Sequence, residues 1–159
     1  MPLRVLEYFS NKNSKIYDDI SIFAIQHLLI DSIDFFQVLL KHFPRNPFII
    51  GIPYSSKTRA IEEIKALGAS VHVPSFDTIY EFVERSLMQK LSQSAKNGQK
   101  ILLVEDGGYA APALHKNPNL KSVQHCLGVV EQTKNGLWRD REIPIVKVPI
   151  VHVAESVLK

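Results

Sequence analysis

Short, uninterrupted apolar runs recur along residues 47–159, and helical patterns separate several of them. Five segments are predicted to be strands: residues 47–52, 70–73, 101–105, 127–130 and 145–153, and most of their residues are apolar. Residues 55–67 and 76–96 are apolar at helical spacing, and a short helical turn is expected over 110–115. A strand that is apolar along its whole length is typical of a sheet buried on both faces. The alternation therefore predicts a parallel sheet with helices on both sides.

This pattern places the chain in the α/β class. The expected architecture is a doubly wound, mostly parallel sheet with helices on both faces, a three-layer sandwich of the flavodoxin-like or Rossmann-like kind. The 159 residues suffice for one such domain, which we assign to residues 47–159. Residues 1–46 are expected to form an N-terminal helical segment that packs on it, because residues 17–43 are apolar at helical spacing. Two helices or one bent helix would fit residues 17–43.

Composition and charge exclude several classes of protein. Lys and Arg number 19 against 16 Asp and Glu, a net charge of +3 without a basic block, so nucleic-acid binding is not indicated. No apolar run approaches the ~20 residues of a membrane span, and residues 1–15 lack a signal-peptide core. The single cysteine, Cys126, rules out an intrachain disulfide and a cysteine metal cluster. We expect a cytoplasmic protein that does not associate with membranes.

No motif for a metal or a nucleotide phosphate stands in the sequence. The six histidines are scattered, and none shows ligand spacing on a clear helix face, so no metal site is predicted. The seven glycines form neither GxGxxG nor GxxxxGKS/T. We therefore expect no cofactor in the isolated chain.

The segments that follow the strands are the candidate site, because ligands of open α/β sheets gather at the carboxyl ends of the strands. Asp106 follows the run 101–105 and precedes two glycines, so it could act as a base or accept a ribose hydroxyl. The alternative is a carboxylate that caps the next helical turn. Ser55 and Ser56 stand where a helix is expected to begin, either to bind an anion or to cap the helix.

Polar residues also follow the run 127–130. Glu131, Gln132, Thr133, Lys134 and Asn135 form either a binding loop or a solvated turn.

Three motifs resemble, in order and in spacing, those of the S-adenosyl-L-homocysteine hydrolase family. They are Ile-Leu-Leu-Val-Glu-Asp-Gly-Gly at 101–108, Cys-Leu-Gly-Val-Val-Glu-Gln-Thr-Lys-Asn-Gly at 126–136, and Ile-Val-Lys-Val-Pro-Ile-Val-His-Val-Ala-Glu-Ser-Val-Leu-Lys at 145–159. The family has Asp-Asp-Gly-Gly, then Gly-x-x-Glu-Glu-Thr-Thr-Thr-Gly, then Val-Pro-Ala-x-x-Val-Asn-Asp-Ser-Val-Thr-Lys. Residues 66–71 are similar to its Leu-Gly-Ala-x-Val stretch. The resemblance spans residues 47–159.

The resemblance implies a substrate-type domain. The family cleaves S-adenosylhomocysteine reversibly to adenosine and homocysteine, after NAD in a following Rossmann domain oxidises the ribose 3′-hydroxyl. Asp106 and Lys159 match catalytic residues of the family, and Glu131 and Gln132 fall at its substrate-binding motif. Thr133, Lys134 and Asn135 stand where three threonines of the family face the NAD.

Several positions depart from the family pattern. Gln132 replaces the acidic ribose ligand and cannot take a proton, Lys134 and Asn135 replace two threonines, and Ala154 replaces an Asn. If residues 47–52 are the first strand, residues 52–54 replace the family's His-x-Thr, and no histidine is expected near the site. The chain ends where the family's linker enters its NAD domain.

We therefore expect the substrate-binding-type domain of an adenosylhomocysteinase-like, NAD-dependent protein, which is inactive alone and binds an adenosine-like or other small polar ligand. NAD would act only with a second, Rossmann domain, covalent or separate. The alternative is a non-catalytic regulatory module that docks on a partner carrying such a domain. Self-association through apolar surface near Trp138 is a further hypothesis. Both interpretations require Asp106 and residues 131–135 to lie side by side on one rim.

Overall fold

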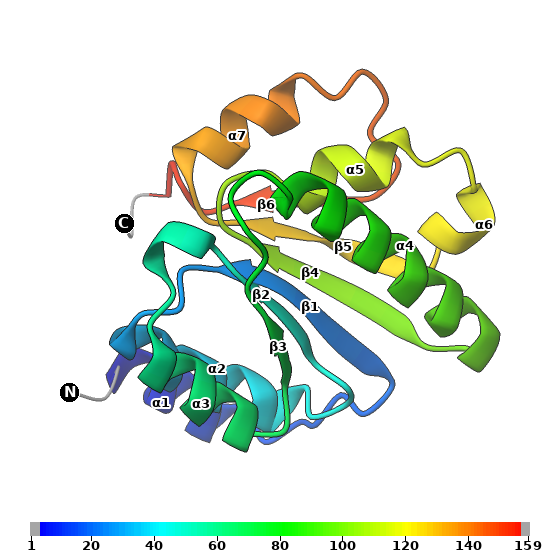
Figure 1. Cartoon of the computed structure of the whole chain (residues 1–159). Coiled ribbons are helices and arrows are strands. Elements are labelled where there is room, and N and C mark those ends of the chain that lie inside the picture. Colours follow the sequence, from blue (N-terminus) through cyan, green and yellow to red (C-terminus); the bar gives the residue numbers. More distant parts are fainter. Residues whose placement is uncertain (1–3, 157–159) are drawn as a thin grey trace.

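The computed structural model describes residues 4–156 and contains a six-stranded, entirely parallel sheet with helices around it (Figure 1). The strands are β1 (Ile20–Gln26), β2 (Phe48–Gly51), β3 (Ser70–His72), β4 (Lys100–Glu105), β5 (Cys126–Glu131) and β6 (Ile150–His152). The helices are α1 (Arg4–Lys12), α2 (Ile30–His42), α3 (Thr58–Ala66), α4 (Ile79–Asn97), α5 (Ala110–Lys116), α6 (Leu120–Val123) and α7 (Lys134–Arg141), with a 3-10 turn, η1 (Pro53–Ser55). The strand order β3-β2-β1-β4-β5-β6 confirms the predicted doubly wound α/β fold.

The central strand β1 corrects the helical expectation for residues 17–43. β1 pairs in parallel with β2 on one side and with β4 on the other. Phe23 and Ile25 belong to the apolar core on one face of the sheet, whereas Ile22 and Ala24 belong to the core on the other face. Burial on both faces is what a central parallel strand requires. The expected helix is therefore right for α2 and wrong for β1.

Two apolar cores lie on the two faces of the sheet. On one face, α2 and α3 contribute Phe36 and Ile64 to a buried cluster with β1, β2 and β3. On the other face, α4 and α5 contribute Leu87 and Leu114 to a second cluster. In Figure 1, α1 to α3 lie below the sheet and α4 to α7 above it, so the helices form two layers. The predicted three-layer arrangement is confirmed.

The last predicted strand is shorter than expected. Residues 145–153 are mostly apolar, with Lys147 and His152 as the polar exceptions, but only β6 joins the sheet, and Ile145 and Val146 are exposed. Pro149 has no N–H to donate, and its carbonyl accepts from Val129 N at 2.9 Å, where the β5–β6 ladder begins. No helix within residues 4–156 has the length and apolar character of a membrane span.

Candidate functional site

The strand order reverses direction between β1 and β4, which makes this position the switch point of the sheet. The carboxyl ends of these two strands define the candidate site. After β1 the chain proceeds outward to β2 and β3, and it then crosses back to β4, β5 and β6. The loops after β1 and β4 therefore diverge to opposite faces of the sheet. In doubly wound folds this divergence opens a crevice where ligands bind.

His27 and Asp106 face each other at this point. His27 follows β1 directly, Asp106 follows β4 directly, and His27 Nε2 lies 3.7 Å from Asp106 Oδ2. The side chains are 31% and 17% exposed, so both reach solvent from a partly buried position. This corrects the expectation that no histidine lies near the site. That expectation took residues 47–52 as the first strand, whereas the first strand is β1 and His27 comes directly after it.

Ser55 completes a chain of three polar side chains. Its Oγ forms a short hydrogen bond with His27 Nδ1, so the imidazole stands between a hydroxyl and a carboxylate. Ser56 Oγ donates to the Ile52 carbonyl at 2.9 Å and closes the η1 turn. The capping role that the sequence suggested for Ser55 or Ser56 is wrong. Helix α3 begins at Thr58, and its N-cap residue, Lys57, makes no side-chain capping hydrogen bond.

Glu105, the last residue of β4, is buried and holds the start of α5. Its carboxylate is fully buried and accepts hydrogen bonds from the backbone N–H groups of Tyr109, Ala110 and Ala111 at 2.6 to 2.8 Å. It thus occupies the capping position that the sequence offered to Asp106. Burial raises the pKa of Glu105 to about 8, against the opposing effect of these N–H donors.

Glu131 fixes the loop after β4 against the loop after β5. Its fully buried carboxylate accepts from Gly107 N at 3.2 Å, from Gly108 N at 2.8 Å, and from the Thr133 N–H and hydroxyl at 2.6 and 2.7 Å. Gly136 is required here because a Cβ would overlap the Glu131 carboxyl group. The prediction that Asp106 and residues 131–135 lie side by side is confirmed.

The other predicted residues of the segment 131–135 lie directly after β5, beside the loop after β4 that contains Asp106. The Thr133 hydroxyl accepts from Gly136 N and so caps α7, while Lys134 and Asn135 are exposed in its first turn. Gln132 is half-buried, and its backbone N–H donates to the Glu105 carbonyl at 3.0 Å. Lys159 lies outside the described residues.

Aromatic rings that sequence reasoning missed stand beside the crevice. Tyr54 and Phe76 are 69% and 68% exposed, with ring centroids 6.5 Å apart, and the Tyr54 ring meets the His27 ring edge-on at 5.6 Å. These exposed rings follow β2 and β3, the two strands on one side of β1 in the sheet. The available signal in the sequence was an aromatic residue in the segment after each of two predicted strands. In the structure the two rings form an apolar wall on this side of the site.

A second aromatic group holds the other side of the Gly107–Gly108 loop. The guanidinium of Arg139 lies 5.5 Å from the ring centroid of Tyr80 and 5.2 Å from that of Tyr109, and Arg139 Nη1 donates to the Gly107 carbonyl at 2.5 Å. Burial raises the pKa of the Tyr109 hydroxyl. Through these contacts Arg139 on α7 and Tyr80 on α4 hold the loop after β4, in which Asp106 lies.

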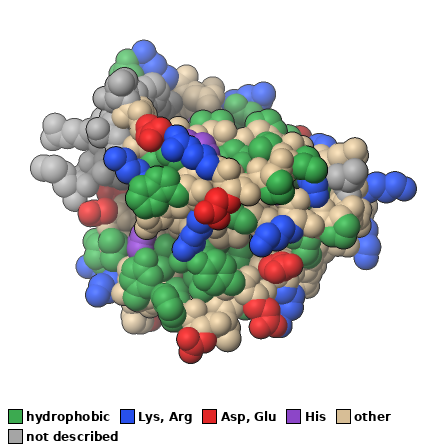
Figure 2. Space-filling model, turned by 90° about the horizontal axis from the view of Figure 1, so that it is seen from above, with side chains coloured by type: hydrophobic (Ala, Val, Ile, Leu, Met, Phe, Trp, Pro, Cys, Tyr) green, Lys and Arg blue, Asp and Glu red, His purple; other side chains and the backbone are tan. Residues whose placement is uncertain are grey.

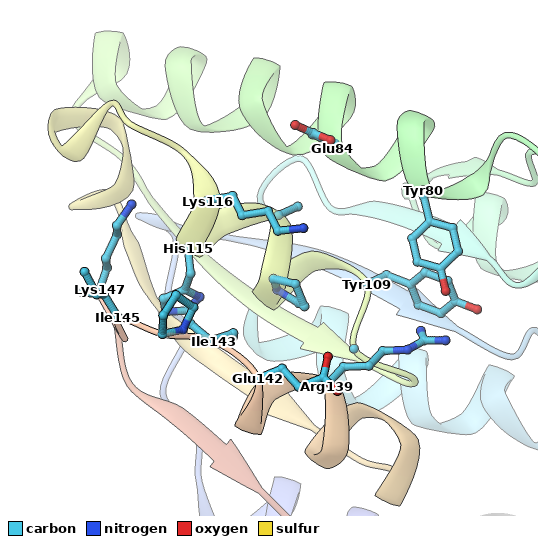
Figure 3. Close-up of a pocket in the computed structure, with 14 residues that line it drawn as sticks. Tyr80, Glu84, Tyr109, His115, Lys116, Arg139, Glu142, Ile143, Ile145 and Lys147 are labelled. Carbon is cyan, nitrogen blue, oxygen red and sulfur yellow. The ribbon is translucent and has the colours of Figure 1, made fainter.

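An open groove of about 630 Å³ continues from these rings between α4, α5 and the segment after α7. In Figure 3, Tyr80, Tyr109 and Arg139 stand at one end of the groove, and His115, Ile145 and Lys147 at the other. Figure 2 shows that hydrophobic side chains gather on this side of the molecule with charged side chains between them. The groove could not be predicted from the sequence, because its walls come from three separate segments.

The buried carboxylate of Asp140 lies beside His152, whose side chain is 22% exposed. Asp140 Oδ2 lies 3.7 Å from His152 Nε2, the Asp140 side chain is 1% exposed, and both of its oxygens lack a hydrogen-bond partner. Burial, with a smaller contribution from the Glu131 charge, raises the pKa of Asp140 to about 7. Among residues 4–156, no group of three or more His, Cys, Asp or Glu side chains could hold a metal ion.

Fold and site together define an open, doubly wound α/β domain with a His–Asp pair at its switch point. No protein-family model matches this chain, and no curated protein matches it either.

Proposed function

We propose that this chain is a nucleoside-binding, substrate-type domain of an adenosylhomocysteinase-like protein, in which His27 and Asp106 contact the ribose hydroxyls. The observation that carries the proposal is the approach of His27 Nε2 to Asp106 Oδ2 at the switch point. The resemblance implies a catalytic Asp after one strand and a His after the first strand. His27 and Asp106 have these positions, although Leu29 stands where the family has Thr.

The chemistry of the crevice suits a nucleoside. A carboxylate accepts hydrogen bonds from hydroxyl groups, and an imidazole either donates or accepts one, so the pair can bind vicinal hydroxyls and move a proton between them. The exposed rings of Tyr54 and Phe76 offer a stacking surface for a planar base on the adjacent wall.

NAD, which the resemblance also implies, fits this chain only at the rim. The Thr133 hydroxyl is engaged with Glu131 and with Gly136 N, so it does not offer a free donor to a cofactor. Lys134 and Asn135 are exposed and could contact a cofactor held by a second domain. NAD would supply ribose oxidation when bound there, and residues 4–156 contribute ligand binding and proton transfer at His27 and Asp106.

Thermal unfolding with added ligand tests the proposal. We expect adenosine and S-adenosylhomocysteine to raise the Tm of the chain, and homocysteine alone to leave it unchanged. The reason is that the proposed contacts of His27, Asp106 and the exposed rings are with the ribose and the base. Asp106→Asn should weaken adenosine binding about tenfold or more, the loss expected for a hydrogen bond to a charged group. Asp19→Asn, an exposed carboxylate at the amino end of β1, is the matched control.

Absence of any shift with all three compounds would contradict the proposal. Hydrolysis of S-adenosylhomocysteine by this chain alone, even with NAD added, would contradict the expectation that it is inactive by itself.

A second candidate is a regulatory module that docks on a partner carrying a Rossmann domain. The exposed ring of Trp138 on α7 and the exposed Ile145 and Val146 favour it, because they lie on the α7 side of the rim. Sedimentation velocity tests the separate hypothesis that the chain associates with itself through the same apolar surface. A dimer that Trp138→Ser disrupts supports self-association through this surface, and a monomer at high concentration counts against it.

A further inference from the structure

We infer that Ser55 is a positioning residue that holds the imidazole of His27 with Nε2 toward Asp106. The inference rests on the proposed function for its consequence in ligand binding. Its geometry stands independently, because Ser55 Oγ meets Nδ1 while Asp106 Oδ2 lies near Nε2.

Backbone hydrogen bonds fix Ser55 relative to His27. Ile52 N donates to the Gln26 carbonyl at 3.0 Å, and Lys57 N donates to the Leu28 carbonyl at 2.9 Å. These two bonds join the residues on either side of His27 to the residues on either side of the η1 turn. The Ser55 N–H donates to the Ile52 carbonyl at 3.1 Å, so the serine is held within that turn. The contact therefore follows from the register of β1 and β2, which brings the two loops together.

The hydroxyl can serve both protonation states of the ring. When His27 is neutral and carries its proton on Nε2, toward the carboxylate, Nδ1 is an acceptor and the Ser55 hydroxyl donates to it. When His27 is a cation, Nδ1–H donates to Ser55 Oγ, and the hydroxyl proton can turn to the Ile52 carbonyl at 3.4 Å. A histidine that transfers protons must keep its orientation in both states, and a hydroxyl with a second acceptor nearby meets that need.

The neighbouring serine provides a matched control. Ser56 carries the same hydroxyl and also donates to the Ile52 carbonyl, but its hydrogen bond closes the turn without involving His27. The ring of Tyr54 packs edge-on against the imidazole and does not fix which nitrogen carries the proton.

Nitrogen NMR of histidine-labelled protein tests the assignment in the absence of ligand. The chemical shifts of Nδ1 and Nε2 give the ratio of the two neutral tautomers of His27. We expect wild type to carry the proton on Nε2, because the Asp106 carboxylate lies near that nitrogen while Ser55 holds the ring in place. Ser55→Ala frees the ring to turn away from the carboxylate, so the preference for the Nε2 tautomer should fall severalfold, up to about tenfold. Ser56→Ala should leave the ratio at its wild-type value, and Ser55→Thr, which keeps the hydroxyl, should restore it.

Three outcomes are decisive. A wild-type tautomer ratio in Ser55→Ala overturns the assignment, and so does an equal change in Ser56→Ala. If Ser55→Ala does not fold, Ser55→Cys, whose thiol is a weak donor, must show an intermediate ratio, and an unchanged ratio overturns the assignment. Adenosine binding is measured separately: a changed ratio in a chain that never binds adenosine refutes the proposed function while the positioning role stands.

Discussion

Asp140 permits a quantitative prediction of how stability depends on pH. Its carboxyl group is 1% exposed, and neither oxygen has a hydrogen-bond partner. Burial raises its pKa from 3.8 to about 7. Between these pH values the folded chain retains a proton at Asp140 that the unfolded chain has lost. The contribution of Asp140 to the free energy of unfolding therefore decreases as pH rises through this interval, and that decrease ends above pH 7.

The size of the effect follows from the two pKa values. A difference of one pKa unit corresponds to ~1.4 kcal/mol, so the ionisation of Asp140 costs the folded state about 4 kcal/mol at pH 8 and only a few tenths at pH 4. Asp140→Asn removes this cost without removing a hydrogen bond. The stability of Asp140→Asn relative to wild type should therefore increase from pH 4 to pH 7 by several kcal/mol, with a slope of at most ~1.4 kcal/mol per pH unit.

Urea unfolding at a series of pH values measures the difference. Trp138, the single tryptophan, lies on α7 two residues before Asp140 and reports unfolding at the site of the change. Asp19→Asn removes an exposed carboxylate and should follow wild type at every pH. The reasoning is refuted if the curves of Asp140→Asn and wild type run parallel from pH 4 to pH 8.

Three further predictions concern buried residues. Glu105→Gln should lower the free energy of unfolding by about 2 kcal/mol at pH 5, because an amide cannot accept all three N–H groups at the start of α5; urea curves that match wild type would contradict this. Gly136→Ala should cost about 3 kcal/mol, since its Cβ would displace the Glu131 carboxyl group, and an unchanged Tm in calorimetry would show that the loop has room. Burial raises the pKa of the Cys126 thiol to about 12, so iodoacetamide should alkylate Cys126 at pH 8 only after urea unfolding, as mass spectrometry can detect.

Much of the fold could be predicted from the sequence because buried parallel strands are continuous apolar runs. β2, β4 and β5 were identified in this way, and β3 was also predicted although it reads Ser-Val-His. β1 was missed because its apolar run continues through Leu28–Ile30 into α2 without an intervening Gly or Pro. The apolar residues of β1 could therefore be read as part of the helical pattern of α2, and the predicted helix was extended backward over the strand.

The candidate site was only partly predictable, for a related reason. Asp106 and its neighbour loop were found because each follows a recognised strand. His27 could not be found because the strand before it was not recognised. Glu131 was expected to contact a ligand, but its surroundings depend on two loops and one glycine from distant positions, which no local pattern displays.

The register between β1 and β4 is the feature that creates the crevice pair. Ile25 pairs with Glu105, and Asp106 N donates to the Ile25 carbonyl at 3.0 Å. By this register Asp106 lies level with Gln26, and His27 begins the β1 loop one residue further along. A shift of one residue would turn the side chains of β1 to the opposite face, and a shift of two would move His27 along the strand by about 7 Å. The apolar residues of β1, which contribute to both cores, fix this register. The same buried side chains that hold the sheet together therefore set the distance between the two polar groups on which the proposed function depends.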